Sequence, residues 1–131
     1  MIPRYTHPDM GRIWSDQRRY ETWLLVEAAA AEAMARHGIV PVEAARAIRE
    51  RGAFDIARIE EIERTTQHDV IAFTTAVAEH VGPDARWMHF GMTSSDVIDT
   101  AQALQMREAC DLILADLDGL DRKSTRLNSS H

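Results

Sequence analysis

Helical spacing of apolar residues over almost the whole chain is the feature that most constrains its fold. Between Asp16 and His37, apolar side chains such as Trp23 and Leu24 recur every three or four residues, and Gly38 follows at a position typical of a helix end. Four further stretches have the same spacing, and none alternates as a strand would. The sequence therefore predicts an all-α chain, with its other helices over residues 42–51, 55–64, 69–81 and 93–117.

Local start and stop signals support these helices. Ser15 and Asp55 can accept hydrogen bonds at helix N-termini, and Gly52 and the Gly82-Pro83 pair are typical of helix ends. The remaining segments are expected to be an extended arm over residues 1–14, a break over 65–68 and a connector over 87–92.

The last predicted helix is the longest, and the chain changes character after it. The final ten residues, RKSTRLNSSH, contain three basic residues and no acidic one, and they lack helical spacing. We interpret residues 121–131 as a non-native polar tail, with a natural frayed terminus as the alternative. The apolar stripe of the helix itself consists of Val97, Ile98, Ala101, Leu104, Met106, Ile113, Leu114 and Leu117.

Composition excludes several classes of function. The net charge of −6 argues against nucleic-acid binding through a broad basic surface. No apolar stretch approaches the roughly 18 residues that would predict a membrane-spanning helix, and the start of the chain lacks the apolar core of a signal peptide. The single cysteine, Cys110, cannot form an internal disulfide. We expect a cytoplasmic protein with neither a nucleic-acid nor a membrane partner.

The stretch HFGMTSSDVIDTA, at the start of the last helix, is the first candidate site. Thr93 and Asp96 have the spacing of a capping box, which would explain one hydroxyl structurally. The alternative is a cradle for a carboxylate or phosphate, because a helix N-terminus offers free N–H groups and partial positive charge. Gly91 would let the backbone approach a ligand, and His89 is within reach of the same cradle. The additional hydroxyls are what capping leaves unexplained.

The segment Gln67-His68-Asp69 is the second candidate. Because the helix dipole disfavours a cation at a helix start, His68 would be a neutral donor or an acid–base group near pH 7. The alternative is a loop histidine that packs or faces water. A metal site is not predicted, because His68 and His89 are far apart in sequence and no HxxxH pair exists.

The Arg4-Tyr5 pair, suited to phosphate binding, is a third and weaker candidate.

Three motifs in order give the chain a family resemblance. RYTHPDMGRIW, TTQHDVIAF and HFGMTSSDVIDTAQ together resemble the N-terminal part of the adenylosuccinate lyase family, within the fumarase/aspartase superfamily. The resemblance covers residues 1 to about 120. It implies an N-terminal helical domain over 1–92, followed over 93–120 by the start of a long helix of the central bundle. Families of this kind assemble as homotetramers whose bundle buries such helices.

The resemblance implies a lyase that eliminates fumarate from adenylosuccinate, leaving AMP, and from the succinyl-carboxamide ribotide of purine synthesis. Neither a metal nor an organic cofactor is implied. Arg4 and Tyr5 would bind the nucleotide phosphate. Thr93 and Ser94, with His89 nearby, would hold a carboxylate of the succinyl group.

The resemblance also implies substrate contacts for Gln67, His68 and Asp69, with His68 an auxiliary catalytic residue. The family's general acid and general base lie on later segments that these 131 residues do not contain, so we expect the chain to be inactive alone.

Two alternative functions remain open at this point. The chain could be a non-catalytic all-α interaction module, or part of a superfamily lyase with another succinyl substrate.

Overall fold

The computed structural model describes residues 2–128, in which all regular structure is helical and no strand is present. The all-α prediction is therefore confirmed. Met1, from the predicted arm, and residues 129–131, from the predicted tail, lie outside the described residues. The helices are α1 (Pro8–Ile13), α2 (Asp16–Arg36), α3 (Val42–Arg51), α4 (Ile56–Thr66), α5 (Asp69–Val81) and α6 (Ser94–Asn128), with short 3₁₀ turns at Pro3–Tyr5 and Pro83–Trp87.

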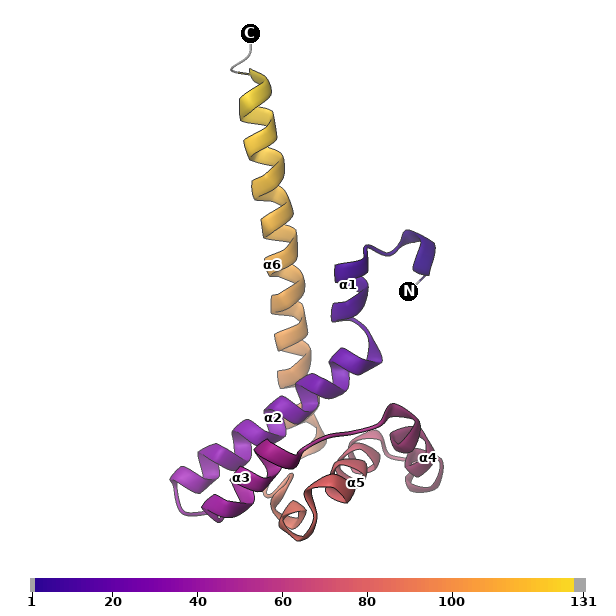
Figure 1. The fold of residues 1–131 in the computed structure, drawn as a ribbon, viewed down its shortest axis with the longest axis vertical. Helices are drawn as coiled ribbons and strands as arrows, with labels where there is room; N and C mark the ends of the chain where they lie inside the picture. The colour runs from indigo at the N-terminus through magenta and orange to yellow at the C-terminus, as the bar shows by residue number, and fades with distance from the viewer. Residues whose placement is uncertain (1, 129–131) are drawn as a thin grey trace.

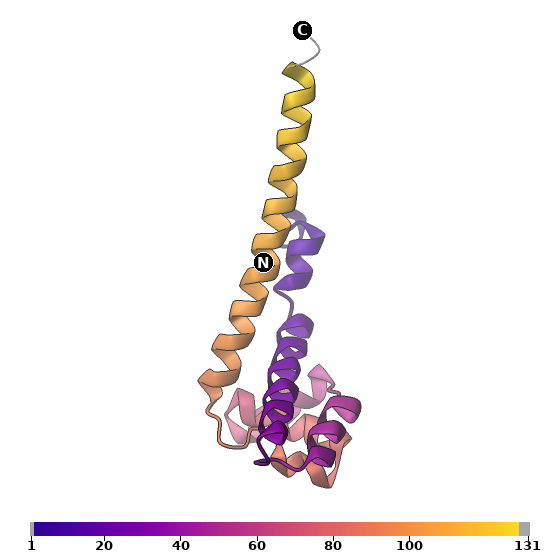
Figure 2. The same cartoon turned by 90° about the vertical axis from the view of Figure 1, so that its left-hand side faces the viewer.

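The helices form a cluster from which α6 projects as a long rod (Figures 1 and 2). Helices α2 to α5 pack together at one end of the molecule, and α6 begins at that end against α2. Helix α1 packs beside α6 farther along the rod. The C-terminal part of α6 extends past all the other helices.

An aromatic cluster forms the centre of the core between α2 and α5. Phe73 is fully buried; its ring lies parallel to that of Tyr20 at 5.6 Å and edge-on to that of Trp23 at 5.4 Å, measured between centroids. Phe54, from the segment before α4, contacts both Tyr20 and Phe73. Such aromatic pairs each contribute about 0.5–1.5 kcal/mol beyond their area burial. The cluster fixes α5, and with it the helix start that carries His68.

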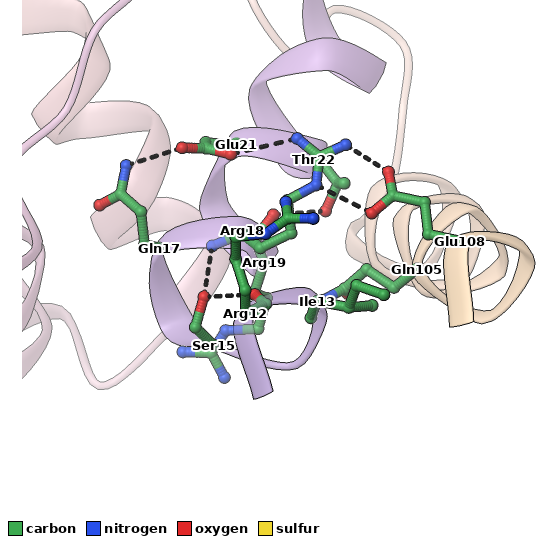
Figure 3. A network of polar contacts seen from close by, with 10 residues as sticks. All are labelled: Arg12, Ile13, Ser15, Gln17, Arg18, Arg19, Glu21, Thr22, Gln105 and Glu108. Atoms are coloured by element: carbon green, nitrogen blue, oxygen red, sulfur yellow. Dashed lines mark hydrogen bonds and ion pairs between the residues drawn. The ribbon is translucent and has the colours of Figure 1, made fainter. Parts of the chain in front are cut away.

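A polar network joins the start of α2 to α6 (Figure 3). The guanidinium of Arg18 pairs with Glu21 on its own helix at 3.1 Å and with Glu108 on α6. The hydrogen bond from Arg18 lowers the pKa of Glu108 below its ordinary value. The pair therefore stabilises the junction at neutral pH, and this contribution is lost as the pH falls from the ordinary carboxyl pKa through the lowered one. Nearby, Gln105 Nε2 donates to the carbonyl of Ile13 at 2.8 Å and ties α1 to α6.

The predicted caps are confirmed. The Ser15 hydroxyl accepts a hydrogen bond from the N–H of Arg18 at 3.1 Å, and the Asp55 carboxylate accepts one from the N–H of Arg58 at 3.1 Å. Gly38 follows α2 with a φ of 72°, which a residue without Cβ adopts readily. These three helix ends depend on local chemistry, which is why the sequence locates them to within a residue or two.

The predicted extended arm over residues 1–14 is wrong. Pro3–Tyr5 form a 3₁₀ turn, and Pro8–Ile13 form a helix. Pro8 occupies the first turn of α1, where its preset φ and missing N–H are tolerated. The side chain of Ile13 is buried, and its carbonyl accepts the hydrogen bond from α6. This helix is therefore stabilised by a contact distant in sequence, which local spacing does not reveal.

The buried face of α6 also differs from the predicted stripe. Val97, Ala101, Gln105 and Ala109 are buried at i, i+4 spacing, whereas Met106 is 53% exposed. Met106 of the predicted apolar stripe thus lies outside this buried row, as do Ile113, Leu114 and Leu117. The buried row includes the polar residue Gln105, which the spacing of apolar residues does not predict.

Helix α6 continues past its predicted end near residue 117, as far as Asn128. No proline interrupts residues 118–128, and the basic side chains of Arg122, Lys123 and Arg126 favour the negative end of the helix dipole. The non-native origin of residues 121–131 stays a prediction. Along this projecting part, Ile113, Leu114 and Leu117 are about half exposed.

No described helix is both long and apolar enough to cross a membrane.

Candidate functional site

The start of α6 presents three hydroxyl groups that the helix does not use. The carboxylate of Asp96 accepts a hydrogen bond from the N–H of Thr93 at 2.8 Å, so the capping function of Asp96 is confirmed. The reciprocal bond from a capping hydroxyl is absent: within residues 2–128, the hydroxyls of Thr93, Ser94 and Ser95 have no hydrogen-bond partner. They stand beside the free N–H groups of a 35-residue helix. Capping alone therefore does not account for this cluster.

The connector before α6 is held by Glu27 of α2, a residue that none of the sequence motifs includes. Its side chain is completely buried, and both carboxylate oxygens bind His89. Oε2 accepts from the backbone N–H of His89 at 2.8 Å, and Oε1 lies 2.7 Å from Nδ1 of the imidazole. A buried carboxylate without partners would be costly, and here both oxygens are satisfied.

One signal in the sequence could have identified Glu27. It lies at helical spacing from Tyr20, Trp23 and Ala31, all of which are buried in the core. An acidic residue on the core face of a helix is rarely fully buried unless it is paired. The position therefore predicts a specific partner, although the sequence does not say which.

The turn between α4 and α5 carries the second candidate segment. Helix α4 continues to Thr66, so the predicted break shortens to Gln67 and His68. His68 caps α5, with its Nδ1 accepting a hydrogen bond from the N–H of Ile71 at 3.3 Å. Because Nδ1 accepts, the ring proton of the neutral imidazole lies on Nε2. His68 therefore has a structural function as the cap of α5. Asp69 Oδ1 accepts from the N–H of Val70 at 2.7 Å.

Two of the candidate residues have a strained, left-handed backbone conformation. Gln67, with a φ of 52°, and His89, with a φ of 58°, are the non-glycine residues with positive φ among residues 2–128. Such conformations cost on the order of 1–3 kcal/mol each and cluster at functional sites. The strain thus marks the same two segments that the sequence motifs single out.

The Arg4-Tyr5 pair lies apart from the other candidates. The guanidinium of Arg4 sits 4.8 Å from the centroid of the Tyr5 ring, and both side chains are exposed. Figures 1 and 2 place the N-terminal segment alongside α6 rather than at the end where α6 begins. No hydrogen bond within the described range joins this pair to residues 67–69 or 89–95. Within residues 2–128, the structure therefore does not join the Arg4-Tyr5 pair to the other candidates by hydrogen bonds.

The surroundings of these groups include shallow surface hollows. In the range that the structure describes, no three His, Cys, Asp or Glu side chains are placed to hold a metal ion. Gln67 lines a shallow hollow of about 340 Å³ with Glu60, Glu63 and Arg64. A larger hollow of about 560 Å³ between α2 and α3 contains none of the candidates.

The fold and these motifs define a class of protein, the all-α lyases. The sequence model of a family described as Lyase matches residues 4–129, and the chain therefore belongs to that family. The sequence is 48% identical over 118 residues to adenylosuccinate lyase of Bacillus subtilis, covering 90% of this chain and 27% of that enzyme. The resemblance to adenylosuccinate lyase is thereby confirmed. The chain spans about a quarter of the length of this relative.

Solved structures confirm the superfamily fold. A 3-carboxy-cis,cis-muconate lactonizing enzyme from Pseudomonas putida superposes with a TM-score of 0.76 at 35% identity, covering 86% of this chain and 27% of that one. A fumarate lyase from Mesorhizobium sp. BNC1 gives a TM-score of 0.71 at 30% identity, covering 79% of this chain and 25% of that one.

Proposed function

We propose that this chain is the N-terminal, substrate-binding part of a carbon–nitrogen lyase that eliminates fumarate from adenylosuccinate, giving AMP, and from the succinyl-carboxamide ribotide of purine biosynthesis. The observation that carries the proposal is the set of unused hydroxyls of Thr93, Ser94 and Ser95 at the start of α6. The similarity to an adenylosuccinate lyase supports the choice of substrate.

The chemistry explains why such a cluster would serve this reaction. Removing a proton next to a carboxylate places additional negative charge on that carboxylate. Fixed donors at this point stabilise the developing charge more than they stabilise the ground state. Thr93 and Ser94 supply hydroxyl donors, and the N-terminus of α6 adds partial positive charge. The cluster therefore holds the succinyl portion of the substrate that leaves as fumarate.

The other candidate groups have complementary functions in this proposal. Arg4, stacked on Tyr5, has guanidinium N–H groups available for the nucleotide phosphate. Gln67, His68 and Asp69 contact the substrate, with the Nε2 proton of His68 available for hydrogen bonding or auxiliary acid–base catalysis.

The position of the N-terminal segment alongside α6, rather than at the end where α6 begins, favours a site shared between subunits. The exposed apolar residues Ile113, Leu114 and Leu117 of α6 form a surface on which other helices of a homotetramer would pack. The nucleotide substrate is the small-molecule partner, no cofactor is needed, and the compartment is the cytoplasm.

The proposal can be tested in a chimeric enzyme. Residues 1–120 of this chain replace the aligned segment of the Bacillus subtilis adenylosuccinate lyase, to which they are similar. Binding of adenylosuccinate and of argininosuccinate is then measured by titration. Preference for adenylosuccinate supports the proposed substrate. Preference for argininosuccinate would assign the segment to a lyase with another succinyl substrate.

Thr93→Val in the chimera separates the capping and binding interpretations of the cluster. Valine keeps the shape and removes the hydroxyl, while the backbone N–H still binds Asp96. We expect kcat/KM for adenylosuccinate to fall by at least about tenfold, with the free energy of unfolding changed by less than about 1 kcal/mol. Thr100→Val, at an exposed site on the same helix, is the matched control. Loss of stability with unchanged kinetics would restore the capping interpretation.

A further inference from the structure

We propose that Glu27 is a positioning residue for His89: it fixes the imidazole with the proton on Nδ1, so that Nε2 is the acceptor presented to the substrate. The inference rests on the proposed function for its catalytic meaning, whereas the pairing itself stands on the structure alone. No motif of the sequence included Glu27.

The geometry of the pair is specific. Glu27 lies on α2, 62 residues from His89 in sequence, and its carboxylate is completely buried. Both oxygens bind the same residue, one through the backbone N–H at 2.8 Å and one through Nδ1 at 2.7 Å. The imidazole is only partly buried, with 26% of the side chain exposed. A carboxylate from the core of α2 thus holds a ring that is itself partly exposed.

Hydrogen-bond chemistry determines the tautomer. The backbone N–H of His89 can only donate, and an ionised carboxylate can only accept. With Glu27 ionised, the 2.7 Å contact therefore requires the proton on Nδ1, which in the neutral ring leaves Nε2 as an acceptor. His68 has the opposite arrangement, because its Nδ1 accepts from the N–H of Ile71. The two candidate histidines therefore present different chemical groups to a ligand.

The backbone contact explains the strained conformation of the connector. His89 has a φ of 58°, and Gly91 follows with a φ of 69°. The hydrogen bond from the N–H of His89 to Glu27 holds the chain in this left-handed conformation just before Thr93. Glu27 consequently positions both the imidazole of His89 and the backbone of the connector that leads to Thr93.

Glu27→Gln tests the tautomer directly. An amide offers one acceptor and one donor, so satisfying the backbone N–H leaves the NH₂ group facing Nδ1. We expect the neutral imidazole of His89 to switch from the Nδ1–H to the Nε2–H form, seen as an exchange of the two ring ¹⁵N chemical shifts in the 131-residue chain labelled at histidine. His68, as Nε2–H throughout, is an internal reference, and His89→Ala identifies the resonances. Glu32→Gln, which alters an exposed carboxylate of the same helix paired with Arg49, is the matched control and leaves His89 unchanged.

The ring ¹⁵N chemical shifts of His89 in the unmodified chain test the pairing with Glu27 even if the variant does not fold. A neutral His89 protonated on Nδ1 supports the proposal, and one protonated on Nε2 overturns it. In the active chimera, Glu27→Gln should lower kcat at least about tenfold, whereas Glu32→Gln should not. Unchanged kcat after a demonstrated tautomer switch would overturn the positioning function. If the unmodified chimera is inactive while Nδ1 carries the proton, the proposed function fails and the pairing stands.

Discussion

The purified 131-residue chain should release no fumarate from adenylosuccinate. The resemblance places the family's general acid and general base on segments that these residues do not include. His68 could act as a single acid–base group, but one such group contributes only about 10²–10⁴-fold. Typical enzymes accelerate their reactions by about 10⁶–10¹⁷-fold. Substrate-binding residues alone therefore leave the chemical step without most of its catalysis.

The assay must exclude traces of the host's own enzyme. Fumarate release is followed at a sensitivity well below one turnover per minute, before and after size-exclusion chromatography. A preparation carrying Thr93→Val and His89→Ala together provides the matched control, because contamination by host enzyme would persist in it. Turnover that co-elutes with the chain and disappears in the double variant would refute the assignment of the missing acid and base.

Phe73→Ala should have the largest effect on stability. The ring is fully buried and contacts Tyr20, Trp23 and Phe54, so its removal leaves a cavity at the centre of the core. Substitutions of this kind cost about 3–5 kcal/mol. Domains of this size are stable by only about 5–15 kcal/mol, so most of the folded population could be lost. The midpoint of urea unfolding, followed by helical circular dichroism, measures the change.

Phe90→Ala is the control for this substitution. Phe90 is 44% exposed and contacts only Trp87 among the aromatic rings of residues 2–128. The same change in side-chain size should therefore cost less than about 1 kcal/mol. Equal destabilisation by both substitutions would show that Phe73 does not lie at the centre of the core.

The parts of the fold that were predicted correctly depend on local chemistry. The caps at Ser15 and Asp55 and the end of α2 before Gly38 each follow from one or two neighbouring residues. The errors depend on distant contacts. Helix α1 is stabilised by the hydrogen bond between Ile13 and Gln105, which are 92 residues apart. Local spacing cannot show that a short proline-containing segment has such an anchor.

In the candidate site, too, the residues predicted from sequence depend on local chemistry and the missed residue depends on a distant contact. Its hydroxyl cluster and the His68 turn were predicted because helix termini have recognisable residue patterns. Glu27 was missed because its meaning depends on a partner 62 residues away. The sequence did provide one indication, an acidic residue on a core face, but only the fold identifies His89 as the residue that satisfies it.

Fumarate release by the chimera of residues 1–120 with the remainder of the Bacillus subtilis enzyme tests the proposed function most directly. We expect kcat for adenylosuccinate within about tenfold of that of the intact relative, because the proposed function gives this chain the equivalent substrate contacts. The remainder of the relative without any N-terminal segment is the control and should be inactive. A chimera that folds and assembles like the relative but releases no fumarate would contradict the assignment of this chain to adenylosuccinate cleavage.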